Sequence, residues 1–177
     1  MKAGQPILVA GIGNIFFGDD AFGCEVAREL MLRPLPEGVR VDDFGIRNYD
    51  LAYALMDGCD AILIDTVMRG EPPGTLYLID PDLAELESGD EIPDAHSMNP
   101  IHVLRMVQSL GGRPGRLYLV ACEPSVLESE DGQMGLSASV QASIPRAIDM
   151  VESLVRDLLH DKLPLRPGLA GAAKEVS

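Results

Sequence analysis

The sequence predicts an α/β fold, a three-layer α/β/α sandwich around a mostly parallel, twisted sheet of about five strands. Two short apolar runs, ILVA at residues 7–10 and AILIDTV at residues 61–67, are typical of strands buried on both faces. Strand-like and helix-like segments also alternate along the chain. This alternation is the order expected when helices cover both faces of such a sheet.

Each predicted element has a local signal. Short apolar or alternating runs bounded by turn residues predict strands at Ile7–Ala10, Val39–Phe44, Ala61–Val67, Thr75–Ile79 and Arg116–Cys122. Apolar residues spaced three and four apart predict helices at Phe22–Leu32, Asn48–Met56, Ile101–Leu110 and Ser139–Leu159. Residues 80–93 are acidic and lack a periodic pattern, so we expect a surface loop or an irregular helix there.

The length predicts a single domain with a sizeable core. A chain of 177 residues has the size of one domain, and no linker or repeat divides residues 1–160. Residues 161–177 are small and rich in proline and glycine, so we expect a flexible tail.

Charge and cysteine content exclude several classes of partner. The chain has 14 basic and 28 acidic residues, a net charge of −14, which argues against nucleic acid and anionic membrane surfaces. Its three cysteines are far apart and form no C-x-x-C pair, so neither a disulfide framework nor a cysteine-built zinc site is expected. No apolar run reaches the roughly 18 residues of a membrane span. These features predict a cytoplasmic protein.

The turn after the first predicted strand carries two adjacent carboxylates. Its sequence, GIGNIFFGDDAFG at residues 11–23, departs from the dinucleotide-binding pattern because Phe16 stands where that pattern needs glycine. Asp19 and Asp20 would also repel a phosphate, so the turn suits a cation better. The alternative is that one of the two aspartates caps the helix that begins near Ala21.

Carboxylates from two distant segments are predicted to meet. If the first and third strands are neighbours, as in flavodoxin-like order, Asp20 and Asp65 both lie at the crevice beyond their carboxyl ends, where ligands bind. His96, in a loop just before a helix, would complete a set of two oxygen ligands and one nitrogen ligand. His102 lies within a predicted helix and His160 at the end of one, so structural or surface roles are expected for both.

The same segments resemble the hydrogenase maturation proteases, nickel-dependent endopeptidases that trim the C-terminus of the large subunit of [NiFe] hydrogenases. The matching segments, in the same order as in that family, are GIGNIFFGDDAFG at 11–23, ILIDTV at 62–67, PPGTLYLI at 72–79, HSMNPIHVL at 96–104, and CEPSVLE followed by GLSASVQ. The resemblance implies that Asp20, Asp65 and His96 bind the metal. Ala21 stands where many relatives have glycine, and Asp20 where some have glutamate, which is longer by one methylene.

The resemblance also implies a substrate. The enzyme would recognise nickel already loaded into a [NiFe] hydrogenase large-subunit precursor and remove the C-terminal extension. Apart from the resemblance, we expect a monomer. Nickel would then be supplied by the precursor rather than held permanently. Two alternatives stay open: an amide hydrolase with a resident zinc on the same three ligands, and a non-catalytic flavodoxin-like binding or chaperone module.

Overall fold

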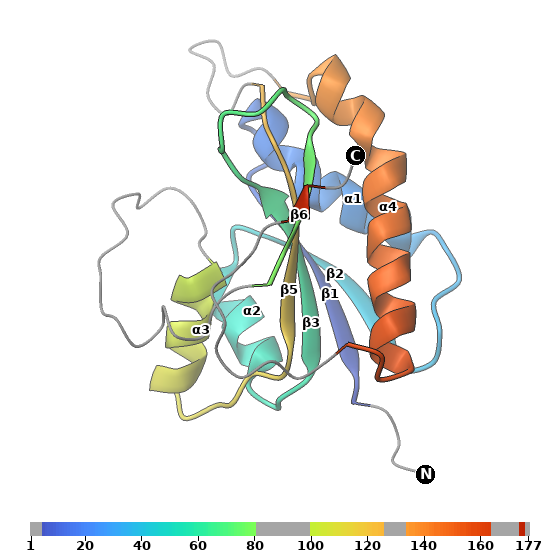
Figure 1. The fold of residues 1–177 in the computed structure, drawn as a ribbon. Helices are drawn as coiled ribbons and strands as arrows, with labels where there is room; N and C mark the ends of the chain where they lie inside the picture. The colour runs from blue at the N-terminus through green and yellow to red at the C-terminus, as the bar shows by residue number, and fades with distance from the viewer. Residues whose placement is uncertain (1–4, 81–99, 126–133, 164–173, 176–177) are drawn as a thin grey trace.

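The computed structural model describes residues 5–80, 100–125, 134–163 and 174–175, and within them it shows a three-layer α/β/α sandwich (Figure 1). A six-stranded sheet has the order β2-β1-β3-β5-β4-β6. Its strands are β1 (Ile7–Ile12), β2 (Val39–Gly45), β3 (Asp60–Thr66), β4 (Leu76–Ile79), β5 (Leu117–Cys122) and β6 (Lys174–Glu175). The predicted fold class is confirmed.

Four helices cover the two faces of the sheet. Helices α1 (Phe22–Met31) and α4 (Ala138–Leu159) pack on one face, and α2 (Asn48–Leu55) and α3 (Pro100–Ser109) pack on the other. The predicted helices therefore all form, with ends that differ from the prediction by at most one residue.

Strands β2, β1, β3 and β5 are parallel, as the apolar runs predicted. In the register of the sheet, Val9 of β1 pairs with Val41 of β2 and with Ile62 of β3, and Ile64 of β3 pairs with Val120 of β5. Because β1 and β3 are neighbours, the expected flavodoxin-like juxtaposition of the first and third strands is confirmed. Strand β4 runs antiparallel to β5.

Two cores explain why these strands read as continuous apolar runs. Side chains alternate across a strand, so neighbouring residues point to opposite faces of the sheet. Val9 and Ile62 enter the core beneath α1 and α4, whereas Leu8 and Leu63 enter the core beneath α2 and α3. Both faces are covered, and both sets of side chains must be apolar.

The described residues of the segment after α4 contact the rest of the fold. Asp161 and the carbonyl oxygen of Leu163 accept hydrogen bonds from Arg116, and β6 pairs antiparallel with β4. Residues 164–173, 176 and 177 of the predicted flexible tail lie outside the described residues. So do most of the predicted loop at 80–93 and the start of the segment that leads into α3.

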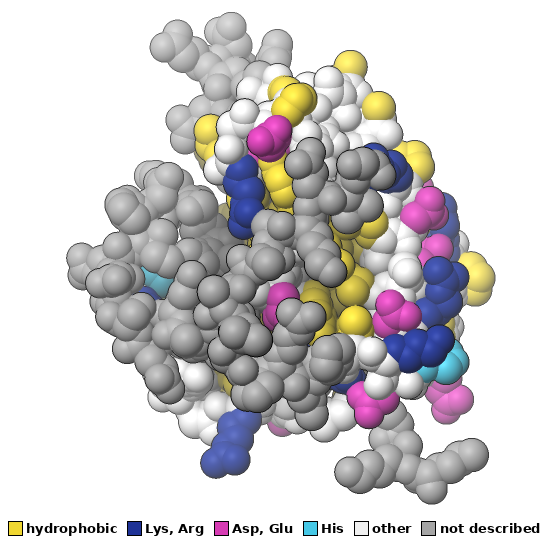
Figure 2. Space-filling model, viewed as in Figure 1, with side chains coloured by type: hydrophobic (Ala, Val, Ile, Leu, Met, Phe, Trp, Pro, Cys, Tyr) yellow, Lys and Arg dark blue, Asp and Glu magenta, His cyan; other side chains and the backbone are white. Residues whose placement is uncertain are grey.

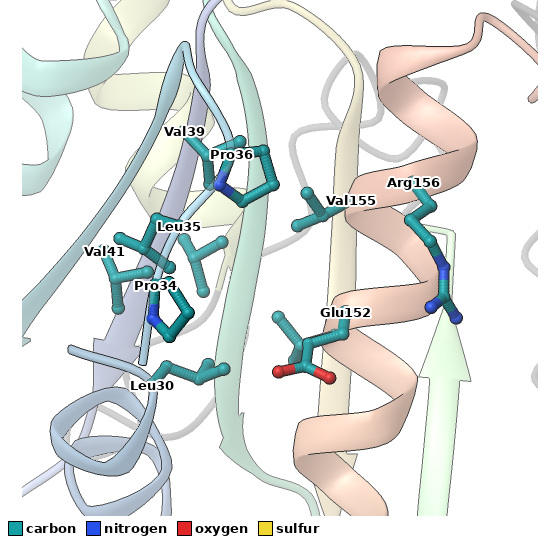
Figure 3. Close-up of a pocket in the computed structure, with 11 residues that line it drawn as sticks. Leu30, Pro34, Leu35, Pro36, Val39, Val41, Glu152, Val155 and Arg156 are labelled. Atoms are coloured by element: carbon teal, nitrogen blue, oxygen red, sulfur yellow. The ribbon is translucent and has the colours of Figure 1, made fainter. Parts of the chain in front are cut away.

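An apolar cavity of about 200 Å³ lies between α1, α4 and the edge of the sheet at β2 (Figure 3). Leu30, Pro34 and Pro36 line one side and Val155 lines the other. The lining comes from the end of α1, the loop that follows it, the first halves of β1 and β2, and the second half of α4. The cavity is therefore remote from the carboxyl ends of the strands, where the predicted site lies.

In the described part of the chain, no helix is both long enough and apolar enough to cross a membrane.

A buried ion pair joins the amino-terminal ends of β3 and β5. The Asp60 carboxylate accepts hydrogen bonds from the Arg116 backbone N–H at 2.9 Å and from the guanidinium Nη2 at 2.6 Å. The side chains of Asp60 and Arg116 are only 5% and 13% exposed. Removing one partner of such a pair is costly because the other charge stays buried without compensation.

We expect Asp60→Ala to lower the free energy of unfolding by roughly 3 kcal/mol. This is the lower end of the range for a broken buried pair, because Asp161 still pairs with Arg116 at 2.8 Å. Urea unfolding followed by far-UV circular dichroism measures the change, since the chain has no tryptophan. The control is Asp50→Ala, which breaks the exposed pair with Arg47 and should cost less than about 1 kcal/mol. Equal effects of the two substitutions would contradict the prediction.

Candidate active site

The candidate site lies where β1 and β3 end. After β1 the chain turns through Gly13 and Asn14 into a 3-10 helix, Gly18–Ala21, which carries Asp19 and Asp20 and leads directly into α1. Asp65 is the next-to-last residue of β3. Because β3 pairs with β1, the two predicted carboxylates come from neighbouring strand ends, at the position where open α/β sheets bind ligands.

Glycines permit α1 to approach the strand ends unusually closely. A Cβ atom on Gly23, in the first turn of α1, would lie 2.0 Å from the carbonyl oxygen of Ile64 and 2.3 Å from that of Ile12. Gly13 has φ +135°, and a Cβ there would lie 1.8 Å from the carbonyl oxygen of Asp20. Any side chain at either position would push the 3-10 helix away from β1 and β3.

Hydrogen bonds orient Asp20 towards the end of β3. Its Oδ2 accepts a hydrogen bond from the Asn14 N–H at 2.8 Å, and its Oδ1 accepts one from the Thr66 hydroxyl at 3.5 Å. The N–H of Thr66 donates to Oδ1 of Asp65 at 2.7 Å. Thr66 thus contacts both carboxylates.

Burial disfavours the ionised form of both carboxylates, and the charge of Asp20 adds to this effect at Asp65. Burial is the main cause that raises the pKa of Asp65 well above that of an ordinary aspartate; the Thr66 N–H lowers this pKa, and the negative charge of Asp20 raises it further. Burial also raises the pKa of Asp20, against hydrogen bonds from Asn14 and Thr66 that lower it. A bound cation would stabilise both ionised groups, so the oxygen donors fit a metal ion by charge and by chemistry.

The third predicted ligand, His96, lies outside the described residues. Among the residues that the structure does describe, no group of three or more histidine, cysteine, aspartate or glutamate side chains is arranged to hold a metal. His102 is exposed on α3, and His160 ends α4 with its Nδ1 2.7 Å from the carbonyl oxygen of Arg156. The surface and helix-end positions expected for these two histidines are confirmed.

Asp19 has a structural role that differs from the predicted cap. Its carboxylate is buried and accepts hydrogen bonds from the N–H and hydroxyl of Ser137, at 2.7 and 2.9 Å, and from the Ser125 N–H at 2.8 Å. It therefore ties the 3-10 helix to the segment after β5 and to the start of α4. The N-cap residue of α1 is Ala21, which makes no capping side-chain hydrogen bond, so the interpretation of Asp19 or Asp20 as the N-cap of this helix is wrong.

Glu123 is a second buried carboxylate at this edge that the sequence reasoning missed. It accepts hydrogen bonds from the N–H groups of Arg69 and Gly70, at 2.9 and 3.1 Å, and from the Tyr77 hydroxyl at 2.7 Å. These bonds fix the loop between β3 and β4. The available signal was an acid directly after the apolar run that ends at Cys122, the same kind of signal that drew attention to Asp65.

The cysteines do not offer a nucleophile. All three are buried free thiols. Burial raises the pKa of Cys122 to about 11, and it also raises the pKa values of Cys24 and Cys59. Because the thiolate is the reactive form, these side chains are inert packing groups at neutral pH.

Comparison with known proteins points to one family. A family model described as hydrogenase maturation protease matches residues 24–154. The putative hydrogenase maturation protease of Methanocaldococcus jannaschii is 32% identical over 153 residues, which cover 83% of this chain and 94% of that protein. The hydrogenase 2 maturation protease of Escherichia coli is 29% identical over 167 residues, covering 88% of this chain and 99% of that protein.

A solved structure agrees with the sequence matches. The hydrogenase maturating endopeptidase HybD from E. coli superposes with a TM-score of 0.72 at 28% identity, covering 86% of this chain and 93% of that one.

We expect Asp65→Asn to stabilise the metal-free protein at pH 7. Because the folded-state pKa of Asp65 is raised, the stability contribution of its carboxyl falls as the pH rises from about 4 through that pKa. Asparagine does not titrate and keeps an oxygen that accepts the Thr66 N–H bond. The gain should therefore be largest at neutral pH and should shrink towards pH 4.

Thermal unfolding in a chelating buffer between pH 4 and pH 8 measures this gain. The control is Asp149→Asn, at an exposed position on α4, which should change little at any pH. A lower melting temperature for Asp65→Asn at pH 7 would contradict the assignment of Asp65 as a carboxylate that folding disfavours.

Proposed function

The chain belongs to the hydrogenase maturation protease family, and we propose that it removes the C-terminal extension of a [NiFe] hydrogenase large-subunit precursor after nickel insertion. The observation that supports this proposal is the pair of carboxylates, Asp20 and Asp65, at the edge where β1 and β3 end. The negative charge of Asp20 disfavours the ionised form of Asp65. A site that disfavours its own ionised state in the absence of a cation is suited to recognise an incoming one.

In this proposal the nickel ion is part of the substrate. Asp20, Asp65 and His96 would hold it, and two carboxylates with one imidazole are reasonable ligands for nickel. Such an ion would polarise the scissile carbonyl or lower the pKa of an attacking water. A precursor without nickel would lack the group that these residues bind, so cleavage would wait for metal insertion.

The residues of the chain itself set the geometry for this step. The Asn14 N–H and the Thr66 hydroxyl hold Asp20, and the Thr66 N–H holds Asp65. Because neighbouring backbone segments supply the two N–H bonds, the carboxylates would be oriented before the substrate arrives. Competition between the cation and protons should make precursor processing weaken at acid pH.

We further propose that the protein acts as a monomer in the cytoplasm. Three free, buried thiols support a reducing compartment. A resident zinc is the competing hypothesis for the same ligands, and metal retained by the purified protein after dialysis would favour it.

Incubation of the purified protein with large-subunit precursor, with and without nickel, tests the proposal. We expect loss of a C-terminal peptide, seen by mass spectrometry, only with the nickel-loaded precursor. Equal cleavage of the nickel-free precursor would show that the ion is not the recognised feature.

Substitution of the proposed ligands should separate chemistry from folding. Asp20→Asn, Asp65→Asn and His96→Ala should each slow processing by more than about 100-fold, since loss of mere supporting contacts at metal sites already costs 10–100-fold. Circular dichroism should report a preserved fold for all three variants. The exposed-site variant Asp149→Asn should process normally. Processing by Asp65→Asn at the rate of the unmodified protein would instead show that Asp65 is not needed for cleavage, and no processing by the unmodified protein would favour the non-catalytic binding module.

A further inference from the structure

Large apolar side chains are exposed on the loops that follow three neighbouring strands. Phe16 and Phe17 follow β1, Ile46 follows β2 and Met68 follows β3, and these four side chains are 59%, 46%, 68% and 72% exposed. In Figure 2, hydrophobic side chains are exposed at the upper end of the molecule, over the loop that joins β3 to β4. Single exposed apolar side chains need no explanation, but several at one edge indicate a binding surface.

The sheet order places these side chains around the carboxylates. Strands β2, β1 and β3 are adjacent and parallel, so the loops at their carboxyl ends lie in the same order along one edge. The Gly13 N–H donates to the carbonyl oxygen of Gly45 at 3.1 Å, which joins the first two loops directly. Asp20 is carried by the segment after β1 that also carries Phe16 and Phe17, and Asp65 stands near the end of β3, three residues before Met68. Apolar side chains therefore flank the proposed cleavage site on both sides.

Hydrogen bonds fix the backbone of the loops that carry these side chains. Oδ1 of Asn14 accepts the Phe16 N–H at 3.0 Å, and the Arg47 N–H donates to the carbonyl oxygen of Phe44 at 2.9 Å. The loop that contains Met68 has the backbone of Arg69 bound to Glu123, with the Arg69 guanidinium 5.4 Å from the centre of the Tyr77 ring. The exposed side chains are thus presented by fixed backbone, which lowers the entropic cost of binding.

We infer that Phe16, Phe17, Ile46 and Met68, the apolar rim, bind apolar side chains of the precursor polypeptide next to the scissile bond. The inference deepens the proposed function and rests on it. An endopeptidase must position a polypeptide across its reacting groups, and three residues of the apolar rim stand on the segments that carry or directly follow the carboxylates that would meet the nickel. The net charge of −14 makes an anionic membrane a poor occupant. A second copy of the chain would cover the carboxylates and block access to them.

Steady-state processing of nickel-loaded precursor by Ile46→Gln and Met68→Gln tests the inference. Each variant should raise KM by roughly tenfold, the loss expected when a buried apolar contact is replaced by a polar one, with kcat changed by less than about twofold. Melting temperature and nickel affinity, measured by calorimetry with nickel chloride, should stay unchanged. The matched control is Leu32→Gln at the far end of α1, where an 86% exposed leucine should tolerate the same change without effect.

Each outcome decides the inference. Normal KM in both rim variants, with active unmodified protein, overturns it and leaves the proposed function standing. If the unmodified protein does not process the precursor, the proposed function fails, and direct binding of the precursor still tests the rim. Weaker binding by the rim variants than by Leu32→Gln would then support the rim, and equal binding would overturn it. Sedimentation that shows a dimer dissociated by the rim substitutions would assign the surface to a second copy and also overturn it.

Discussion

The structure depends on the close approach of α1 to the ends of β1 and β3. Gly23 packs against backbone carbonyl oxygens of both strands, and Gly13 packs against the carbonyl oxygen of Asp20. These contacts bring the 3-10 helix over the strand ends and hold two acids together that would otherwise repel each other. The stability of the two surrounding cores supplies the free energy that offsets this repulsion.

Four acids at one edge of the sheet divide into two kinds according to their surroundings. Asp19 and Glu123 each accept at least three hydrogen bonds from other segments, and they join loops to the sheet. Asp20 and Asp65 receive fewer donors from the described part of the chain, and burial raises the pKa of each. Hydrogen-bond donors thus separate Asp19 and Glu123 from the proposed ligands Asp20 and Asp65 more clearly than burial does, because Asp19 and Asp65 are both buried.

Much of the fold was predictable because its signals are local. The apolar runs at β1 and β3 and the spacing of apolar residues in α4 predict elements that the structure confirms, and the neighbouring positions of β1 and β3 follow from the common strand order of such sheets. The placement of Asp20 beside Asp65 followed from that order. The partners of Asp19 were not predictable, because Ser125 and Ser137 are more than 100 residues away and only tertiary structure brings them close. The role of Glu123 was not predictable for the same reason, because its backbone hydrogen-bond donors lie in the loop after β3 and only tertiary structure brings them close.

The pairing of β6 with β4 covers one edge of the sheet. An exposed strand edge offers unpaired N–H and C=O groups to other chains, and proteins protect such edges with charges or with a covering segment. The outer edge at β2 carries Arg40 and Asp42, which form an ion pair at 2.8 Å. The opposite edge at β4 is covered by Lys174 and Glu175 from the end of the chain. A shortened protein that ends at Leu163 would uncover the β4 edge, and its solubility would then fall before its fold was lost.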